Sequence, residues 1–495
     1  MTSTVTSTPS LLSRRQLITA ANAAGTSLVA VLVLGACSGK GEKSTSASTA
    51  TSPTASSTAT DNDDQSVVDG LAEQVRTHWP HMSQVWPGAD YTRHSIVLLK
   101  ANEQLSAQAA WLITPESVRT MDSKEYAGIT VPPSYDELKH EGRPAISLLL
   151  NPSFGGGEIA SDIATDQNEN GPAASGVEAR VRTLYRLATH ELVHFYHQSE
   201  AVRSASSNRD TVYPLQSEPR VLRALLHDRL NLAVTDPANR DTHLSHARSW
   251  YDQWVSGFRE EVDSIREYDV REGTAVYIER RGDYVGSKLT GEELHKAQVA
   301  GLHTKRSTSV DQESYMLGFV SGILLDELRP TWKDDFYSTG KAPAELLLEG
   351  VTPVADDTGG NVRQEIEKLI AEEDARVKPA MEEVDRVTAN TSVPYLRYEG
   401  RPQVSYENSY TYKGLTVLVN TILNLRSQDG EVSVVGATTL RGADATTGYN
   451  IPLEAGKYTY EDGVLKLTGE TVSGRTSARR TTEDGREVFL MTVTS

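Results

Sequence analysis

The order of apolar and polar positions divides the chain into three regions. From Val67 onwards, short runs of strand or helix character alternate up to the apolar run 145–151. From residue 177 to about residue 390, apolar residues recur with helical period in nearly every segment. Beyond residue 390, strand-like runs are separated by Asp-Gly pairs, which are typical of β-hairpins. The pattern therefore predicts an α+β protein.

These periods predict individual elements. Strands are expected at 94–100, 108–114 and 145–151, and a short helix from Val67 to Val75. Helices are expected at 177–199, 215–232, 243–266, 270–281, 314–328 and 362–387. We expect a mainly helical domain with a small N-terminal β-sheet over residues 66–390 and an all-β accessory domain over residues 391–495.

The N-terminal 36 residues have the composition of an export signal. Arg14 and Arg15 precede a largely apolar stretch, and residues 1–36 contain no acidic residue. The run SRRQLI resembles a twin-arginine signal, and LGAC, ending at Cys37, resembles the lipobox of bacterial lipoproteins. An uncleaved membrane span of about 20 apolar residues is the alternative. We expect a signal peptide at 1–36 and a lipid on Cys37 that holds the protein at the extracytoplasmic face of the cell membrane.

Composition limits the partners of the mature protein. Residues 37–65 are mostly Ser, Thr, Ala and Gly, which predicts a disordered tether. Cys37 is the only cysteine, so an acylated protein has no disulfide. Loss of Arg14 and Arg15 takes the net charge from −18 to −20, which disfavours nucleic acid as a partner. The charge says nothing about oligomeric state.

One motif points to metal chemistry. Residues 189–194, THELVH, contain HExxH. In a helix, residues four apart differ by one turn and about 40° of rotation, so His190 and His194 can bind one ion. Glu191 lies about 100° from His190, where it can act as general base on a metal-bound water rather than as a ligand. We expect Zn²⁺ as the cofactor; two ordinary histidines beside a solvated glutamate are the alternative.

The third ligand has two candidates on residue grounds. Glu272 is one, although Asp269 three residues before it would also fit a capping box at a helix start. Glu218 is the other, although it also fits an acidic residue in the first turn of a helix. His197 lies about 10 Å along the helix from His190, so we expect it at the rim rather than on the metal.

The order of these motifs resembles the gluzincin group of zinc metallopeptidases. There, HExxH is followed by a helix that begins Glu-Gly-x-Ala-x-Tyr, as at residues 272–277, and the glutamate before the glycine is the third ligand. The run YMLG at 315–318 with 324–332 is similar to a later helix of uncharacterised bacterial proteins of this kind. The resemblance covers residues 145–332 and implies a zincin-like fold, Glu272 as third ligand and peptide substrates.

Further residues are candidates for supporting roles. Peptide hydrolysis needs a donor to the developing oxyanion, for which we expect Tyr315, with Tyr277 second and ordinary core tyrosines as the alternative. A ligand imidazole can be oriented by a carboxylate, for which Glu267, Asp269 and Glu279 are candidates.

The strand at 145–151 precedes the metal helix, where zincin-like folds place an edge strand that pairs with substrate. It is predicted either as that edge or, because of its three leucines, as a buried central strand.

The sequence thus predicts an extracytoplasmic, membrane-anchored zinc metallopeptidase, a hydrolase acting on a peptide or protein. The alternative is a surface lipoprotein that keeps zinc without turnover and acts as a binding or assembly module. Glu191 favours the enzyme, because a scaffold has no use for a general base.

Overall fold

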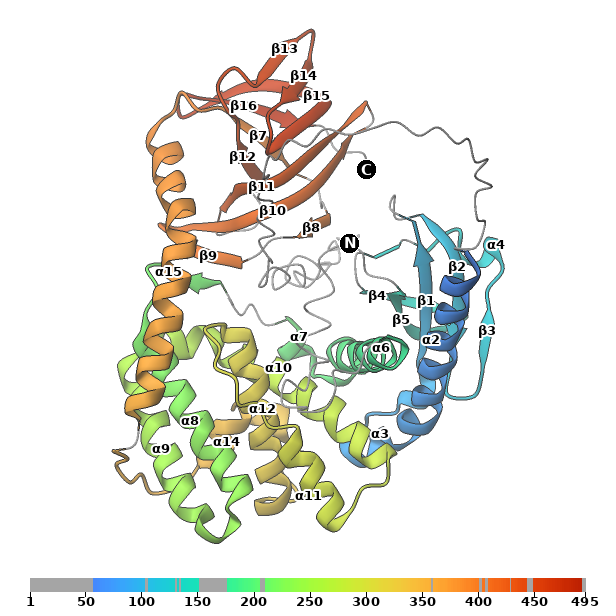
Figure 1. Cartoon of the computed structure of the whole chain (residues 1–495), viewed down its shortest axis with the longest axis vertical. Helices are drawn as coiled ribbons and strands as arrows, with labels where there is room; N and C mark the ends of the chain where they lie inside the picture. The colour runs from blue at the N-terminus through green and yellow to red at the C-terminus, as the bar shows by residue number, and fades with distance from the viewer. Residues whose placement is uncertain are drawn as a thin grey trace, which may run out of the picture.

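The protein has a mixed α/β structure: a helical middle with a small sheet at its N-terminal end and a sheet-rich region at its C-terminal end (Figure 1). The computed structural model describes residues 57–102, 106–129, 131–132, 135–150, 176–204, 210–357, 359–399, 403–405, 408–427, 429–442 and 448–491. The predicted signal peptide and Cys37 lie outside these ranges. Within them, no helix is long and apolar enough to cross a membrane.

The N-terminal sheet has five strands in the order β3-β2-β1-β5-β4. They are β1 (Ser95–Ala101), β2 (Ala107–Ile113), β3 (Val118–Thr120), β4 (Tyr135–His140) and β5 (Arg143–Leu149). The sequence predicted β1, β2 and β5, whose residues are largely buried, and missed β3 and β4. Those two strands are exposed or half-buried at the sheet edges, so they lack an apolar pattern.

The strand predicted at 145–151 is not an edge. β5 pairs in parallel with β1 on one side and antiparallel with β4 on the other. The residues Ile146, Leu148 and Leu149 are at most 3% exposed. The edge interpretation was therefore wrong and the central one is confirmed; among the described strands, β4 forms the edge on this side.

The first described helix, α2 (Ser57–His78), begins earlier than the sequence predicted. Residues 57–65, expected as the end of the tether, are helical. Asp64, expected in solvent, is 3% exposed and forms ion pairs with Lys100 at 3.1 Å and Arg180 at 3.0 Å. The burial of Asp64 depends on tertiary contacts, because Lys100 and Arg180 are both distant from it in the sequence.

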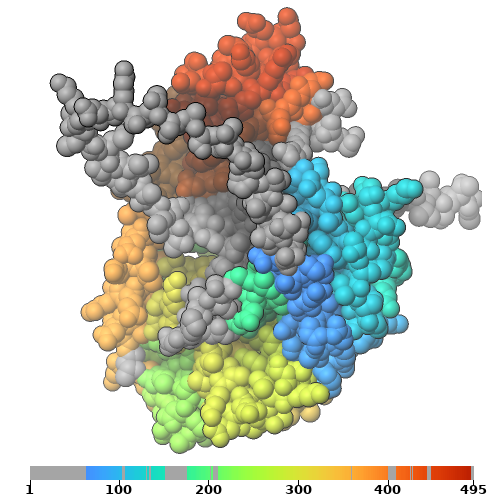
Figure 2. All heavy atoms as spheres, turned by 45° about the vertical axis from the view of Figure 1, so that its right-hand side comes forward, coloured from blue at the N-terminus to red at the C-terminus, as the bar shows by residue number. Residues whose placement is uncertain are grey.

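The helical middle holds the longest helices. Its larger helices are α6 (Val177–Leu192), α8 (Ser217–Thr235), α9 (Arg240–Gly257), α10 (Arg259–Gly286), α11 (Gly291–Ala300), α12 (Val310–Leu328) and α15 (Gly360–Ala389). Shorter ones are α3 (Met82–Val85), α4 (Ser123–Tyr126), α7 (Glu200–Ser204), α13 (Phe336–Thr339) and α14 (Pro343–Leu348). Figure 2 shows the N-terminal sheet and α2, in blue and cyan, against these helices.

Helix α10 runs without interruption through a predicted break. The sequence placed a break between residues 266 and 270, whereas the chain leaves helical geometry at Phe258, directly after Gly257. Asp269 and Glu272 therefore lie in the middle of a helix. The capping-box role for Glu272 is wrong, because a capping box needs a helix start.

Helices α10 and α12 touch through their backbones. A Cβ at Gly318 would lie 2.0 Å from the Cα of Gly273, and one at Gly322 would lie 2.2 Å from the ring of Tyr277. No side chain larger than hydrogen fits there. Gly273, which follows Glu272, thus has a packing role, because it allows α12 to pack closely against α10.

The C-terminal region is one sheet that closes on itself. Its strands are β7 (Tyr395–Tyr398), β8 (Gln403–Ser405), β9 (Asn408–Tyr412), β10 (Leu415–Ser427), β11 (Gly430–Gly442), β12 (Tyr449–Pro452), β13 (Tyr458–Glu461), β14 (Val464–Thr468), β15 (Val472–Glu483) and β16 (Arg486–Met491). Pairing runs β15-β16-β7-β12-β11, and β15 also pairs with β11. This closes a ring of five strands around a core that includes Leu423, Val434 and Phe489.

Two connections tie this sheet to the helical middle. The first half of α15 packs on α8 through Ile366, and its second half packs on the sheet through Val377 and Val384. Figure 1 shows α15 running from the helices to the sheet. In addition, β6 (Thr211–Val212), which follows α7 in the chain, pairs with β9.

Candidate metal centre

The HExxH motif, residues 190–194, spans the end of helix α6 and the turn that follows it. The chain is α-helical to Leu192, and residues Val193–His197 then form one π-helical turn. The predicted helix to residue 199 is therefore too long, since Gln198 is already extended. His190 and His194 are 1% and 4% exposed, so the pair lies inside the protein.

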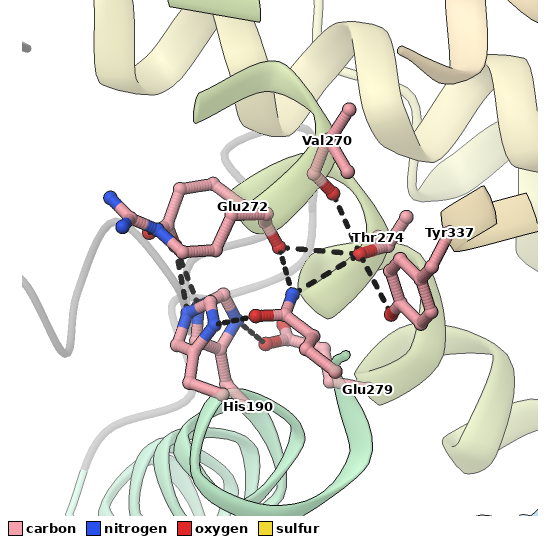
Figure 3. A network of polar contacts seen from close by, with 9 residues as sticks. His190, Val270, Glu272, Thr274, Glu279 and Tyr337 are labelled. Carbon is pink, nitrogen blue, oxygen red and sulfur yellow. Dashed lines mark hydrogen bonds and ion pairs between the residues drawn. The ribbon is translucent and has the colours of Figure 1, made fainter. Parts of the chain in front are cut away.

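Three predicted ligand residues converge at this point. The Nε2 atoms of His190 and His194 lie 3.0 Å apart, and Glu272 Oε2 lies 3.2 Å from the first and 2.9 Å from the second. Figure 3 shows Glu272 reaching from α10 towards His190 on α6. The structure therefore brings together side chains that are far apart in the sequence.

Hydrogen bonds on the far side of each imidazole fix its orientation. His190 Nδ1 donates to Glu279 Oε2 at 2.8 Å, and Glu279 is completely buried. His194 Nδ1 donates to Gln198 Oε1 at 3.0 Å, while Gln198 Nε2 donates to the carbonyl of Arg271 at 2.6 Å. When both imidazoles are neutral, with the proton on Nδ1, both Nε2 lone pairs face Glu272 Oε2, as metal binding requires.

Glu279 was among the predicted orienting carboxylates, whereas Gln198 was missed. Gln198 follows His194 by four residues, one helical turn, and this spacing is the signal that could have indicated it.

The cluster attracts positive charge. Burial lowers the pKa of His190, but its bonds to Glu272 and Glu279 outweigh burial and raise the pKa to about 10. Burial opposes ionisation of Glu272, yet the two histidines and Arg271 hold its pKa well below the ordinary value. His190 therefore holds a second proton beside the anionic Glu272, and a metal cation that binds between them would take the place of that proton.

The donor set suits a zinc ion. Tetrahedral zinc with bonds of about 2.0–2.1 Å keeps neighbouring ligand atoms about 3.4 Å apart, and two imidazoles with one carboxylate are a common catalytic set. The three distances here are 2.9–3.2 Å. One proton can satisfy only one of the facing lone pairs, whereas one divalent cation satisfies all three. The residues present therefore fit the ion.

Two further predicted residues lie at the cluster. Glu191 is 5% exposed, and its carboxylate lies within 4.8 Å of the ligand atoms of His190 and His194. The ring of Tyr315 meets the ring of His190 edge-on, with centroids 5.9 Å apart. Tyr277 instead donates to Asp326 at 2.6 Å and packs on Trp332, so its candidacy as oxyanion donor was wrong.

The other candidate carboxylates lie elsewhere. Glu218 pairs with Arg363 on α15 and is 44% exposed, so it was wrong as an alternative ligand. Glu267 is exposed, and Asp269 pairs with Arg223 and accepts a bond from Ser314. Of the candidate carboxylates on α10, Glu272 and Glu279 are the two that bond a motif imidazole.

The described residues contain one more group with metal-ligand chemistry. It comprises Glu125, His140 and Glu141 near the tip of the β4–β5 hairpin. Arg119 already bonds both glutamates, at 2.9 Å and 2.7 Å, so the acidic charge there has a partner. This group is a satisfied surface network.

His197 lies off the metal cluster, as expected. Its Nε2 lies 3.0 Å from His94 Nε2 at the start of β1, and its ring stacks on Tyr91. The Tyr91 hydroxyl in turn donates to the carbonyl of Thr189, beside His190. This histidine pair therefore anchors the end of the metal helix to the N-terminal sheet.

The histidine pair should make folding sensitive to acid. Burial lowers the pKa of His94 to about 4 and, with His94 nearby, that of His197 to about 3. The unfolded chain takes up these protons near pH 6.5, so stability is full above that pH and falls as the pH drops towards 4. We expect about 2 kcal/mol to be lost per histidine between pH 7 and pH 5.

Urea unfolding at several pH values measures this loss. The double variant His94→Gln, His197→Gln should flatten the pH dependence, whereas His246→Gln, a surface histidine that contacts a backbone carbonyl, should leave it unchanged. An unchanged slope in the double variant would contradict the assignment.

The centre thus has a buried imidazole pair, a facing carboxylate, a neighbouring glutamate and a tyrosine. Comparison of the chain with known protein families, curated proteins and solved structures finds no match to any of them. The resemblance to gluzincins therefore rests on the sequence motifs alone.

Proposed function

We propose that the protein is a zinc-dependent metallopeptidase with a zincin-like catalytic region. The observation that carries the proposal is the meeting of Glu272 Oε2 with both motif Nε2 atoms, with Glu191 alongside. A structural zinc site needs a fourth protein ligand, whereas three ligands leave a position for water or substrate. The described residues supply three, and a general base next to them.

Each side chain at the centre would have its own role in hydrolysis. His190, His194 and Glu272 would hold Zn²⁺, which supplies a Lewis acid and lowers the pKa of water. Glu191 accepts a proton from the attacking water and passes it to the leaving amine. Tyr315, beside His190, donates to the carbonyl oxygen as negative charge develops there. Glu279 and Gln198 keep both imidazoles in the tautomer that faces the centre.

The location proposed for this activity follows from the sequence. The export signal and the lipobox-like Cys37 favour a protein anchored by lipid on the extracytoplasmic side. Its substrate would be a peptide or protein within reach of the tether that begins at Cys37.

Replacing Glu191 by glutamine tests the function. We expect the full chain to bind one equivalent of zinc with or without the change, and peptide hydrolysis to fall by about 100- to 10,000-fold in Glu191→Gln. Metal analysis and turnover of a broad peptide library measure the two effects. Glu267→Gln, an exposed glutamate on α10, is the matched control and should keep full activity.

Bound zinc with no hydrolysis in either the natural chain or the variant would refute the peptidase. That result would favour the alternative, a zinc-containing binding lipoprotein.

A further inference from the structure

One arginine supports two of the three candidate ligands. Arg271 precedes Glu272 on α10, and its Nε donates to Glu272 Oε1 at 3.1 Å. Its backbone carbonyl accepts from Gln198, which holds His194. Neighbouring side chains on a helix do not normally face one another, so this contact needs a cause. The guanidinium lies over the ring of Tyr268, 5.1 Å from its centroid, and the residue is only 5% exposed.

The two oxygens of Glu272 therefore have different partners. Oε2 faces the two imidazoles, and Oε1 faces the guanidinium. A carboxylate can bind a metal through one oxygen or through both. A charged donor on Oε1 makes the second mode costly, because that oxygen would have to give up a charge-assisted hydrogen bond in a buried site.

We propose that Arg271 is a positioning residue that restricts Glu272 to metal binding through one oxygen, which keeps the remaining coordination position open. The inference rests on the metal site of the proposed function but not on the identity of the substrate. Without Arg271, Oε1 is free to join the metal and occupy space that water or substrate needs. Site geometry, rather than metal retention, is what Arg271 controls.

Cobalt(II) in place of zinc tests this directly. Its visible absorption is intense in four-coordinate sites and weakens when a fifth ligand joins, so it reports ligand number without any substrate. We expect the full chain to bind one Co²⁺ with an intense four-coordinate spectrum. Arg271→Gln should retain the ion but lose band intensity, and Arg271→Lys, which keeps a cationic donor, should retain the natural spectrum.

Controls separate this role from a merely structural one. Arg266→Gln, a half-buried arginine on the same helix paired with Asp263 and Glu345, should leave the spectrum unchanged. Arg271→Met, which keeps the aliphatic stem over Tyr268, repeats the test in case Arg271→Gln does not fold. Peptide hydrolysis in the glutamine variant should fall by about 10- to 100-fold.

An unchanged cobalt spectrum in Arg271→Gln, or loss of the ion from the folded variant, would overturn the inference. Equal spectra for the lysine and glutamine variants would also do so, because charge on Oε1 would then be irrelevant. If Arg271→Gln shows the spectral change and the natural chain hydrolyses no peptide, the peptidase is refuted and this inference stands.

Discussion

Replacing Glu272 by alanine is expected to lower the affinity of the protein for zinc by more than about 100-fold, beyond what loss of an outer-shell partner costs. The reason is that Glu272 Oε2 lies within 3.2 Å of the Nε2 atoms of both motif imidazoles. Competition with a chromogenic chelator measures the affinity. Hydrolysis should be lost with the metal, and excess zinc should restore part of it.

Glu218→Ala is the matched control for this change. Glu218 is the other glutamate that the sequence offered as third ligand, but it pairs with Arg363 and lies on the surface. Its replacement should leave zinc affinity within experimental error. If Glu218→Ala weakened zinc binding and Glu272→Ala did not, the assignment of the centre would be wrong.

Replacing Arg223 by methionine is expected to lower the free energy of unfolding by about 3–5 kcal/mol, because buried Asp269 loses its bidentate cation and buried Glu313 keeps only Arg220. Arg223 is completely buried at its side chain and bonds Asp269 through two nitrogens, at 3.0 Å and 2.8 Å. It also bonds Glu313 at 2.7 Å. Asp269 precedes Glu272 by three residues, and Glu313 precedes Tyr315 by two.

This network thus joins α8, α10 and α12 behind the metal centre. Burial raises the pKa of Glu313 to about 7, although Arg220 and Arg223 both lower it. Removal of Arg223 should therefore drive Glu313 to take up a proton. Urea unfolding measures the loss of stability, and zinc affinity should fall with it, because α10 and α12 position Glu272 and Tyr315.

Arg363→Met provides the comparison. Its ion pair with Glu218 has side chains that are 41% and 44% exposed, so its loss should cost less than about 1 kcal/mol. Equal losses for the two arginines would mean that burial does not govern the contribution of the Arg223 network.

The sequence anticipated much of the centre because its chemistry is local. His190, Glu191 and His194 fall within one helical turn, so their relation follows from helix geometry. Tyr315 was also named in advance, and its ring lies beside His190. Gln198 was missed although it follows His194 by only four residues; it bonds His194 from the first extended position after the π-helical turn.

Several of the wrong predictions concern residues whose contact partners are distant in the sequence. The sequence predicted residues up to 65 as a solvated tether, but Asp64 forms ion pairs with Lys100 and Arg180. The strands β3 and β4 had no apolar signal because edge strands are partly solvated. The predicted break in α10 was wrong because Asp269, which looked like a helix start, is buried against Arg223 on α8.

By itself, the sequence determined the periodicities that give helices and central strands, the spacing that turns two imidazoles to one side, and the charge that limits partners. Only the tertiary structure showed that Glu272, Tyr315 and Glu279 lie beside His190, whereas the other candidates, Glu218, Tyr277, Asp269 and Glu267, have other partners or lie in solvent. The physical reason is that the candidates for each role lie in similar local sequence. They differ in whether folding buries them beside a partner from far along the chain.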